Sequence, residues 1–357
     1  FGGLLVSLAI GTKLLYAVMA PAFLVTALLC LRSLPFRRRV VATVVPLLLG
    51  MLVGLFPVMI YLFRDVDGFM FNNLQYHRLN AVWYQLQGVT DTMSIGSKVY
   101  YISGLLAEPS NVALSVCAVF LTLAVMRTLG AGRPSTTLRA GGPAVLLSGL
   151  LVLFSAALLF MITPLADQYV AIPILFGLLF VVCLYAGIPE EGTPYARLVL
   201  VAAALATVFF TGPRLFKYQD RVCDVRSWTA ISVHATAGQI KDAIGPLRDG
   251  DVVATLSPLY VMEAGLPILP ELATGPFMFR IGDLIPAAKR REYVATSPSD
   301  IGRLLEKTCP KAILVGFEAE LDSSLVEYAK EHNYTRVDKD FQGGTLYVRR
   351  EENHGLH

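Results

Sequence analysis

The chain has 357 residues, of which 55% are hydrophobic and only 16% are charged, and its mean hydropathy is +0.58. This composition is too apolar and too poor in charge for an ordinary soluble protein, so the sequence predicts a membrane protein. The formal net charge of +3 is small, and charge alone therefore indicates neither nucleic acid nor an acidic partner.

The chain begins with an apolar run that opens at Phe1 and stops at Thr12 and Lys13. The run lacks the basic start of a signal peptide and passes directly into a second apolar run. We therefore expect this sequence to be the C-terminal part of a longer protein. A lysine beside a membrane either extends its amine to the interface or pairs with an anion such as a lipid phosphate.

Several further apolar runs approach the length of about 20 residues that a helix needs to cross the core of a bilayer. After the partial run at 1–11, the sequence predicts spans at 14–31, 40–63, 112–125, 144–162, 169–188 and 197–211. The protein is therefore predicted to be a multi-pass helical bundle.

Arginines gather in two of the predicted connections, at residues 32–39 and 127–139. Basic residues in short connections mark the cytoplasmic side of a membrane, so both are predicted to be cytoplasmic. It follows that the connection at 64–110 and everything after Gly212 lie on the opposite side. This arrangement is expected for a protein of the cytoplasmic (inner) membrane whose C-terminal domain is extracytoplasmic.

The stretch FNNLQYHRLNAVWY, residues 71–84, combines polar and aromatic residues within the long connection. If it is helical, Asn73, His77 and Asn80 share one face and Arg78 lies on another. Two interpretations remain open. The stretch is either an amphipathic helix at the membrane surface or part of a binding site. Arg can donate to phosphate oxygens, and His can donate or accept a hydrogen bond.

A third polar group opens the predicted span ADQYVAIPILFGLL, where Asp167, Gln168 and Tyr169 follow one another. Polar residues at this position can simply cap the helix, and this alternative also stays open. No stretch of the chain resembles a nucleophile elbow, a phosphate-binding loop or a dinucleotide-binding motif.

After Gly212 charges become frequent and apolar runs shorten to strand length, as in DVVATL, KAILVGF and TLYVRR. These runs alternate with helical patterns at 227–244, 299–307 and 321–332. The order predicts a small α/β domain. The fold class is thus a polytopic α-helical membrane bundle, residues 1–212, followed by a small extracytoplasmic α/β domain, residues 213–357.

Two of the five cysteines, Cys223 and Cys309, lie in the predicted α/β domain. In an oxidising compartment they are expected to form a disulfide, and the alternative is two separate buried thiols. No Cys or His spacing is typical of a metal site, so neither a metal nor another cofactor is predicted.

Four features together resemble a known family: the glycine-containing helix that ends in Thr12 and Lys13, the stretch FNNLQYHRLN, the helix QYVAIPILFGLL and the α/β tail. They resemble integral-membrane glycosyltransferases of the C fold. The closest likeness is to the family 39 branch, which contains protein O-mannosyltransferases and bacterial aminoarabinose transferases. Many members have an arginine before the tyrosine of the third stretch, where this chain has Gln168.

The resemblance implies inverting transfer of a sugar from a polyprenyl-phosphate donor at the outer face of the membrane. It also implies an acidic residue in a loop that would precede Phe1, so no catalytic residue is assigned in this chain. A phosphosugar head needs basic donors at helix ends and polar groups that face the sugar. We expect the donor site to be lined by Lys13, Asn73, His77, Arg78, Asn80, Gln168 and Tyr169.

Two other classes of function remain as alternatives. A secondary transporter would also place polar groups among spans, but transporters usually show inverted repeats and charges near the bilayer midplane. In this sequence the charges gather at the ends of the predicted helices. A non-catalytic membrane scaffold is the third possibility, because the expected catalytic loop lies outside the sequence.

Overall fold

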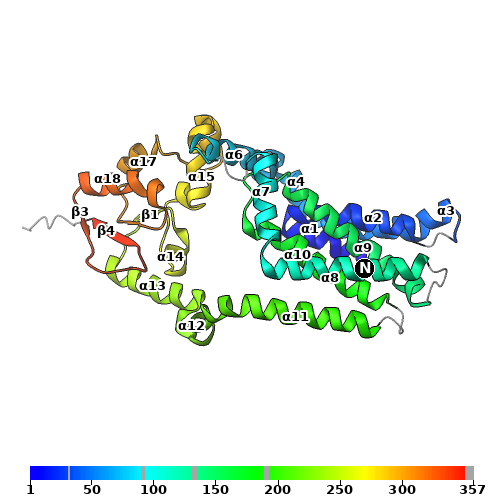
Figure 1. Ribbon diagram of the computed structural model, residues 1–357. Helices are drawn as coiled ribbons and strands as arrows, with labels where there is room; N and C mark the ends of the chain where they lie inside the picture. The colour runs from blue at the N-terminus through cyan, green and yellow to red at the C-terminus, as the bar shows by residue number, and fades with distance from the viewer. Residues whose placement is uncertain (31–32, 90–92, 131–135, 189–192, 350–357) are drawn as a thin grey trace, which may run out of the picture. The chain divides into compact units, whose positions relative to one another are not determined.

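The computed structural model describes residues 1–30, 33–89, 93–130, 136–188 and 193–349 (Figure 1). It divides into two compact units, Phe1–Phe216 and Lys217–His357. The sequence placed the boundary after Gly212. The helix there continues through Gly212 and Pro213 and ends at Phe216, where the first unit also ends.

The described part of the first unit contains 5 helices that are long and apolar enough to cross a membrane. Four of these candidate spans are α8 (Pro109–Gly130), α9 (Thr136–Leu159), α10 (Asp167–Ala186) and α11 (Thr193–Phe216). The fifth joins three helical segments, α3 (Phe36–Arg39), η2 (Val40–Val44) and α4 (Val45–Arg64). Five of the six complete spans predicted from the sequence are therefore found.

The span predicted at 14–31 is present as one apolar helix, Leu14–Leu29, which is shorter than the five candidate spans. It begins with the 3-10 turn η1 (Leu14–Val18) and continues as α2 (Met19–Leu29). Pro21 explains the start of α2, because proline cannot donate a backbone hydrogen bond and is tolerated only in the first turn of a helix. Residues 31 and 32 lie outside the described residues.

Helices α1 (Gly2–Thr12) and α4 pack closely through small residues. A Cβ atom at Gly3 would lie 1.9 Å from the carbonyl oxygen of Leu47, and one at Gly54 would lie 2.0 Å from the Ser7 hydroxyl. Gly50 faces Gly3 as well, so the contacts advance along both helices together and the helices run in the same direction. Small residues four apart are a common means of close packing between membrane helices.

Two contacts show which helix ends lie together. Lys13, the residue after α1, holds its Nζ 5.3 Å from the centroid of the Tyr169 ring at the start of α10. Arg214 near the end of α11 pairs with Glu108 just before α8, at 2.7 Å. These ends therefore form one end of the bundle, which we call the Lys13 end.

The predicted connection at 64–110 is helical over most of its described part. It comprises α5 (Val66–Met70), the π-helical turn η3 (Phe71–Gln75), α6 (Tyr76–Leu86) and α7 (Ile95–Leu106). The Asp65 side chain accepts from the Gly68 backbone N–H and so caps α5. Ser94 and Ser97 form a capping box at the start of α7. Because these helices follow α4 directly, they begin at the Lys13 end.

The second unit is built on a sheet of strand order β1-β2-β4-β3. Its strands are β1 (Val253–Thr255), β2 (Ala312–Val315), β3 (Tyr334–Arg336) and β4 (Thr345–Arg349). β1 and β2 are parallel, with Val253 opposite Ala312, and the other pairs are antiparallel. The three predicted strands are confirmed. β3 was not predicted, because its sequence YTR contains no apolar run and only Tyr334 is buried.

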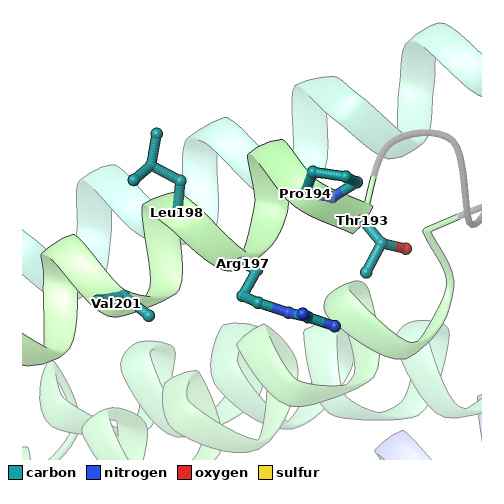
Figure 2. A pocket seen from close by; sticks show the side chains of 5 residues that line it. All are labelled: Thr193, Pro194, Arg197, Leu198 and Val201. Carbon is teal, nitrogen blue, oxygen red and sulfur yellow. The ribbon is translucent and has the colours of Figure 1, made fainter.

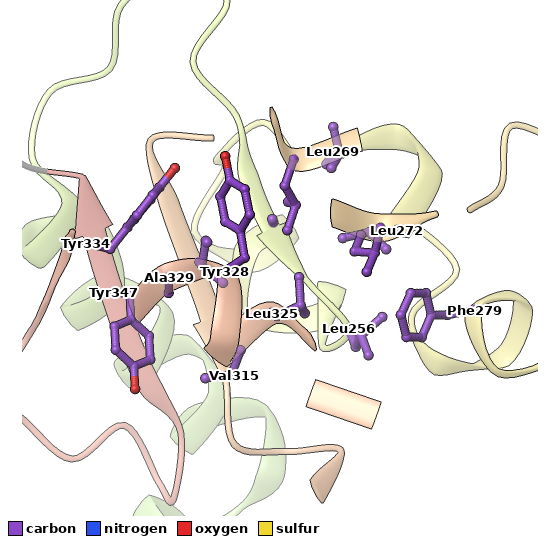
Figure 3. Close-up of a cluster of buried hydrophobic side chains, with 14 residues drawn as sticks. Leu256, Leu269, Leu272, Phe279, Val315, Leu325, Tyr328, Ala329, Tyr334 and Tyr347 are labelled. Carbon is purple, nitrogen blue, oxygen red and sulfur yellow. The ribbon is translucent and has the colours of Figure 1, made fainter. Parts of the chain in front are cut away.

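Helices cover both faces of this sheet. Ala312 and Leu314 pack in one cluster with α13 (Thr229–Ile244) and α14 (Pro258–Glu263). Ile313 and Val315 pack in the other with α17 (Ile301–Thr308) and α18 (Ser323–Glu331), part of which Figure 3 shows. The three predicted helices are thus present. Shorter elements complete the unit: α12 (Gln219–Cys223), η5 (Val225–Ser227), η6 (Pro270–Leu272), α15 (Pro276–Ile281), η7 (Gly282–Leu284), α16 (Ala287–Glu292) and η8 (Ala319–Asp322).

The expected disulfide is not formed. Cys223 and Cys309 are both free thiols, and both are exposed rather than buried. Cys223 belongs to the short helix α12, whereas Cys309 ends α17 in a left-handed conformation and donates from its Sγ to the carbonyl of Glu306 at 3.1 Å. The two thiols lie on different elements and are not bonded to each other, so the prediction of a bridge was wrong for this structure.

Candidate functional site

The first group of candidate residues lies where α1 ends and α10 begins. Lys13 leaves α1 in an extended conformation, and its exposed side chain reaches over the ring of Tyr169. The interaction of an ammonium with an aromatic face contributes about 0.5–1 kcal/mol at exposed sites. Gln168, next to Tyr169, is exposed as well. Three of the seven predicted residues are thus brought together at one point of the Lys13 end.

Capping alone does not account for the polar start of α10. The N-cap residue is Ala166, and no side chain accepts a capping hydrogen bond there. Asp167 stands in the first turn, where a carboxylate is favoured by the helix dipole. The side chains of Gln168 and Tyr169 are therefore available for other contacts.

The Tyr169 ring packs against a small apolar cluster. Buried Leu159, Leu165 and Val170 form its core, and residues of α7 and α10 pack against them, among them Tyr101 and Tyr169 itself. Since these residues come from three helices, the ring beneath the Lys13 amine has a position fixed by packing rather than by a loop.

Lys98 is a residue that the sequence reasoning missed. Its side chain is only 2% exposed, and its Nζ donates to the carbonyl of Phe160 at 2.9 Å and to the Thr163 hydroxyl at 2.8 Å. Burial lowers the pKa of the Lys98 amine from its ordinary value. These bonds tie α7 to the connection between α9 and α10. A signal was present, because Lys98 lies three and four residues before Tyr101 and Ile102, on the packed face of α7.

The second group of candidate residues lies on η3 and α6. Asn73 donates from its side-chain amide to the carbonyl of Phe69 at 2.9 Å, and Asn80 is 9% exposed with no hydrogen-bond partner for its Oδ1. His77 and Arg78 both have exposed side chains. The predicted common face is therefore only partly realised, because its middle member, His77, is more exposed than the other two.

The environment of His77 favours its neutral form. The ring of Tyr76 meets the imidazole edge-on, with 5.3 Å between centroids. Desolvation by neighbouring atoms lowers the pKa of His77. A neutral imidazole has one nitrogen that donates and one that accepts, so it can bond to a hydroxyl group as well as to a phosphate.

The two groups of candidate residues are not in direct contact. α6 packs chiefly against η3, and within the described ranges no hydrogen bond or ring contact joins Asn73, His77, Arg78 or Asn80 to Lys13 or Tyr169. Both groups nevertheless belong to elements at the Lys13 end. A single ligand can contact both sets of residues only if its head is large and carries several charged or polar atoms.

A groove of about 560 Å³ lies elsewhere in the first unit. Figure 2 shows the side chains of α11 that line it: Thr193, Pro194, Arg197, Leu198 and Val201. These residues lie in the first turns of α11. The opposite end of α11, near Arg214, belongs to the Lys13 end of the bundle. The groove therefore includes none of the predicted site residues.

Among the residues that the structure describes, no group of three His, Cys, Asp or Glu side chains is arranged to hold a metal ion. Comparison with family models, with curated proteins and with solved structures finds no match to this chain. What the site can do must therefore be argued from its own chemistry. It offers an exposed amine, an exposed guanidinium, an imidazole and several amides.

Proposed function

We propose that this chain is part of a membrane glycosyltransferase that takes a sugar from a polyprenyl-phosphate donor and passes it to an acceptor. The observation that carries the proposal is the place of Lys13: an exposed amine at the end of an apolar helix, held over Tyr169. A polyprenyl phosphate keeps its tail in hydrocarbon and its phosphate at the headgroup level. Cations that receive it must therefore lie at helix ends, where their charge is also less costly than at the bilayer centre.

Each candidate residue has a role in this proposal that suits its chemistry. Lys13 and Arg78 donate to the phosphate oxygens, and His77 bonds to the phosphate or to a sugar hydroxyl. Asn80 offers a buried amide oxygen that has no partner, which a hydroxyl donor would satisfy. Asn73, Gln168 and Tyr169 contribute further polar groups. The proposal assigns no catalytic residue in this chain and no metal or other cofactor.

The proposed orientation places the Lys13 end and the second unit at the outer face of the cytoplasmic membrane. Its support is the arginine distribution: Arg37, Arg38 and Arg39 lie in α3, and Arg197 near the start of α11, at the ends away from Lys13. Arginine-rich short connections favour the cytoplasmic side. The acceptor would then be an extracytoplasmic molecule.

The test places the protein in sealed vesicles that contain a labelled polyprenyl-phosphate sugar. A glycosyltransferase releases the polyprenyl phosphate and transfers the labelled sugar to an acceptor in cell-envelope extract. A transporter would move the intact donor across the bilayer, and a scaffold would do neither. Either of these two results would overturn the proposal.

A matched pair of variants tests the site itself. Lys13→Ala should weaken donor binding by about tenfold to a hundredfold, the effect of losing one charge-assisted hydrogen bond. Arg38→Ala removes the same charge from an exposed position at the other end of the bundle and should leave binding unchanged. Equal affinities for Lys13→Ala and the wild type would remove Lys13 from the donor site.

A further inference from the structure

The second unit begins with a segment that has no core of its own, residues 217–231. It contains α12, η5 and the first residues of α13. Every described side chain in it is exposed. The exposed set includes five sizeable apolar side chains, between 41% and 68% exposed: Tyr218, Val222, Val225, Trp228 and Ile231. So many adjacent apolar side chains in water are costly, which indicates that something covers them.

The segment nevertheless has a defined shape. The Trp228 indole N–H donates to the carbonyl of Val222 at 3.2 Å. The Ser227 hydroxyl donates to the carbonyl of Asp224 at 2.8 Å, and the Asp224 carboxylate accepts from the backbone N–H of Arg226 at 3.0 Å. These bonds lie within the segment, so its apolar side chains are presented by a preformed backbone.

The apolar residues recur at a helical spacing. Tyr218, Val222, Val225 and Trp228 follow one another at intervals of four, three and three residues. Backbone hydrogen bonds from Val222 to Tyr218 and from Trp228 to Val225 close two short helical pieces, which are separated by Asp224 in an extended conformation. Tyr218 and Val222 therefore share one side of the first piece, and Val225 and Trp228 lie close together at the second.

Basic residues accompany this apolar side. Lys217, Arg221 and Arg226 are all exposed. The Arg221 guanidinium lies over the Tyr218 ring, 5.7 Å from its centroid. Apolar and aromatic side chains beside Lys and Arg are the composition of a helix that lies in the headgroup region of a membrane.

The chain itself limits how far this segment can lie from the membrane. It follows directly on Phe216, the last residue of the candidate span α11. Trp228 is 12 residues further on, and a largely helical chain of that length reaches roughly 20 Å. The headgroup layer on each side of the bilayer is about 5–8 Å thick, so the segment can reach it from the end of α11 and lie along it.

We propose that residues 217–231 bind the headgroup region of the bilayer that α11 crosses, with a preference for anionic phospholipids. Tyr218 and Trp228 lie at the interface, where an aromatic ring with one polar end is favoured. Val222, Val225 and Ile231 enter the apolar boundary, and the three basic side chains contact lipid phosphates. The segment thereby anchors the start of the second unit to the membrane surface. This inference is independent of the proposed glycosyl transfer.

The test measures the depth of Trp228 in the full chain, reconstituted in vesicles. The chain has two tryptophans, so Trp83→Phe leaves Trp228 as the only one. Lipids brominated near the headgroup should quench its fluorescence more strongly than lipids brominated near the chain end. Aqueous iodide should quench it weakly, and adding phosphatidylglycerol to phosphatidylcholine vesicles should strengthen the lipid quenching.

Charge is tested by a matched pair of triple variants in the same background. Replacing Lys217, Arg221 and Arg226 with alanine should lower the equilibrium constant for binding of the segment to the membrane about a hundredfold. Each basic residue near an anionic surface contributes about fivefold, and the three factors multiply. Replacing three other exposed basic residues of the second unit, Arg303, Lys330 and Arg336, should leave the quenching unchanged. Strong iodide quenching without lipid quenching in the unsubstituted segment would overturn the proposal. So would protection from both quenchers, which would mean that protein covers Trp228.

Discussion

Gly54 of α4 lies so close to Ser7 of α1 that a Cβ atom at Gly54 would stand 2.0 Å from the Ser7 hydroxyl oxygen. No real side chain tolerates that distance, so Gly54→Ala must push the two helices apart or displace the Ser7 side chain. Overpacking of this kind costs about 1–3 kcal/mol. We expect a lower midpoint of thermal unfolding for detergent-solubilised Gly54→Ala protein.

The matched control for this variant is Gly104→Ala. Gly104 lies inside α7, and a Cβ atom there would meet nothing within 4 Å. Alanine is also the better helix former, by about 1 kcal/mol. Gly104→Ala should therefore unfold at the wild-type temperature or above it. Equal midpoints for Gly54→Ala and Gly104→Ala would show that α1 and α4 are not in close contact.

Lys98 should be important for stability although it lies outside the proposed donor site. Lys98→Met keeps the length of the side chain but leaves the Phe160 carbonyl and the Thr163 hydroxyl without their donor. Each buried group that loses its partner costs about 1–3 kcal/mol. We expect a clear loss in the midpoint of chemical unfolding. Lys13→Met, which removes an exposed amine and its contact of about 0.5–1 kcal/mol with Tyr169, should lower that midpoint far less and reduce donor binding instead.

Hydropathy was sufficient to find most of the bundle, because a spanning helix is a local property of about 20 consecutive residues. It overestimated the length of the span at 14–31, whose described helix, Leu14–Leu29, begins with the 3-10 turn η1 and continues as α2. The short strand β3 was missed for a different reason. It has no apolar run of its own and depends on pairing with β4, which no local pattern reveals.

The candidate site was predictable only in its residue types. Lys13 and Tyr169 were selected separately, and the contact between them depends on how α1 and α10 pack. The spacing of Lys98 could have placed it on the packed face of α7, but its partners could not be predicted, because they are a backbone carbonyl and a hydroxyl more than 60 residues away. The disulfide was inferred from compartment and number alone. Neither of these specifies the distance between two thiols.

Free thiols at Cys223 and Cys309 predict a specific labelling pattern. Under native conditions without reductant, both should be alkylated by a hydrophilic maleimide, because both are exposed. Cys117, which is 2% exposed within the bundle, should react far more slowly. Mass spectrometry of the digested protein measures the modification at each position. A linked peptide that contains Cys223 and Cys309 in unreduced protein would restore the bridge predicted from the sequence.

The proposed orientation is tested by single cysteines in a variant whose native cysteines are replaced. Cysteines at Gln87 and Glu320 should react with a membrane-impermeant thiol reagent in intact cells, whereas a cysteine at Arg38 should not. The same protection is expected at Arg133, which was part of the sequence prediction and lies outside the described residues. The reverse pattern would place the Lys13 end in the cytoplasm and would contradict a donor site at the outer face.

His77 and Arg78 are the remaining test of the donor site. Both side chains are exposed on α6. Replacing either with alanine should therefore preserve the fold and reduce transfer from a polyprenyl-phosphate donor. Loss of one charge-assisted hydrogen bond of about 1.5–3 kcal/mol corresponds to roughly a tenfold to hundredfold lower rate.

The conservative variant of Arg78 separates charge from geometry. Arg78→Lys should recover only part of the rate, because an ammonium lacks the planar fork that meets two phosphate oxygens at once.

Replacing Trp83, which follows on the same helix, should weaken the binding of α6 to the membrane surface and spare the transfer rate if its ring is an interfacial anchor. The rates are measured at subsaturating donor, where binding and chemistry both contribute. Wild-type rates for His77→Ala and Arg78→Ala would leave α6 as an amphipathic helix of the membrane surface. The predicted donor contacts would then be reduced to the group of Lys13, Gln168 and Tyr169.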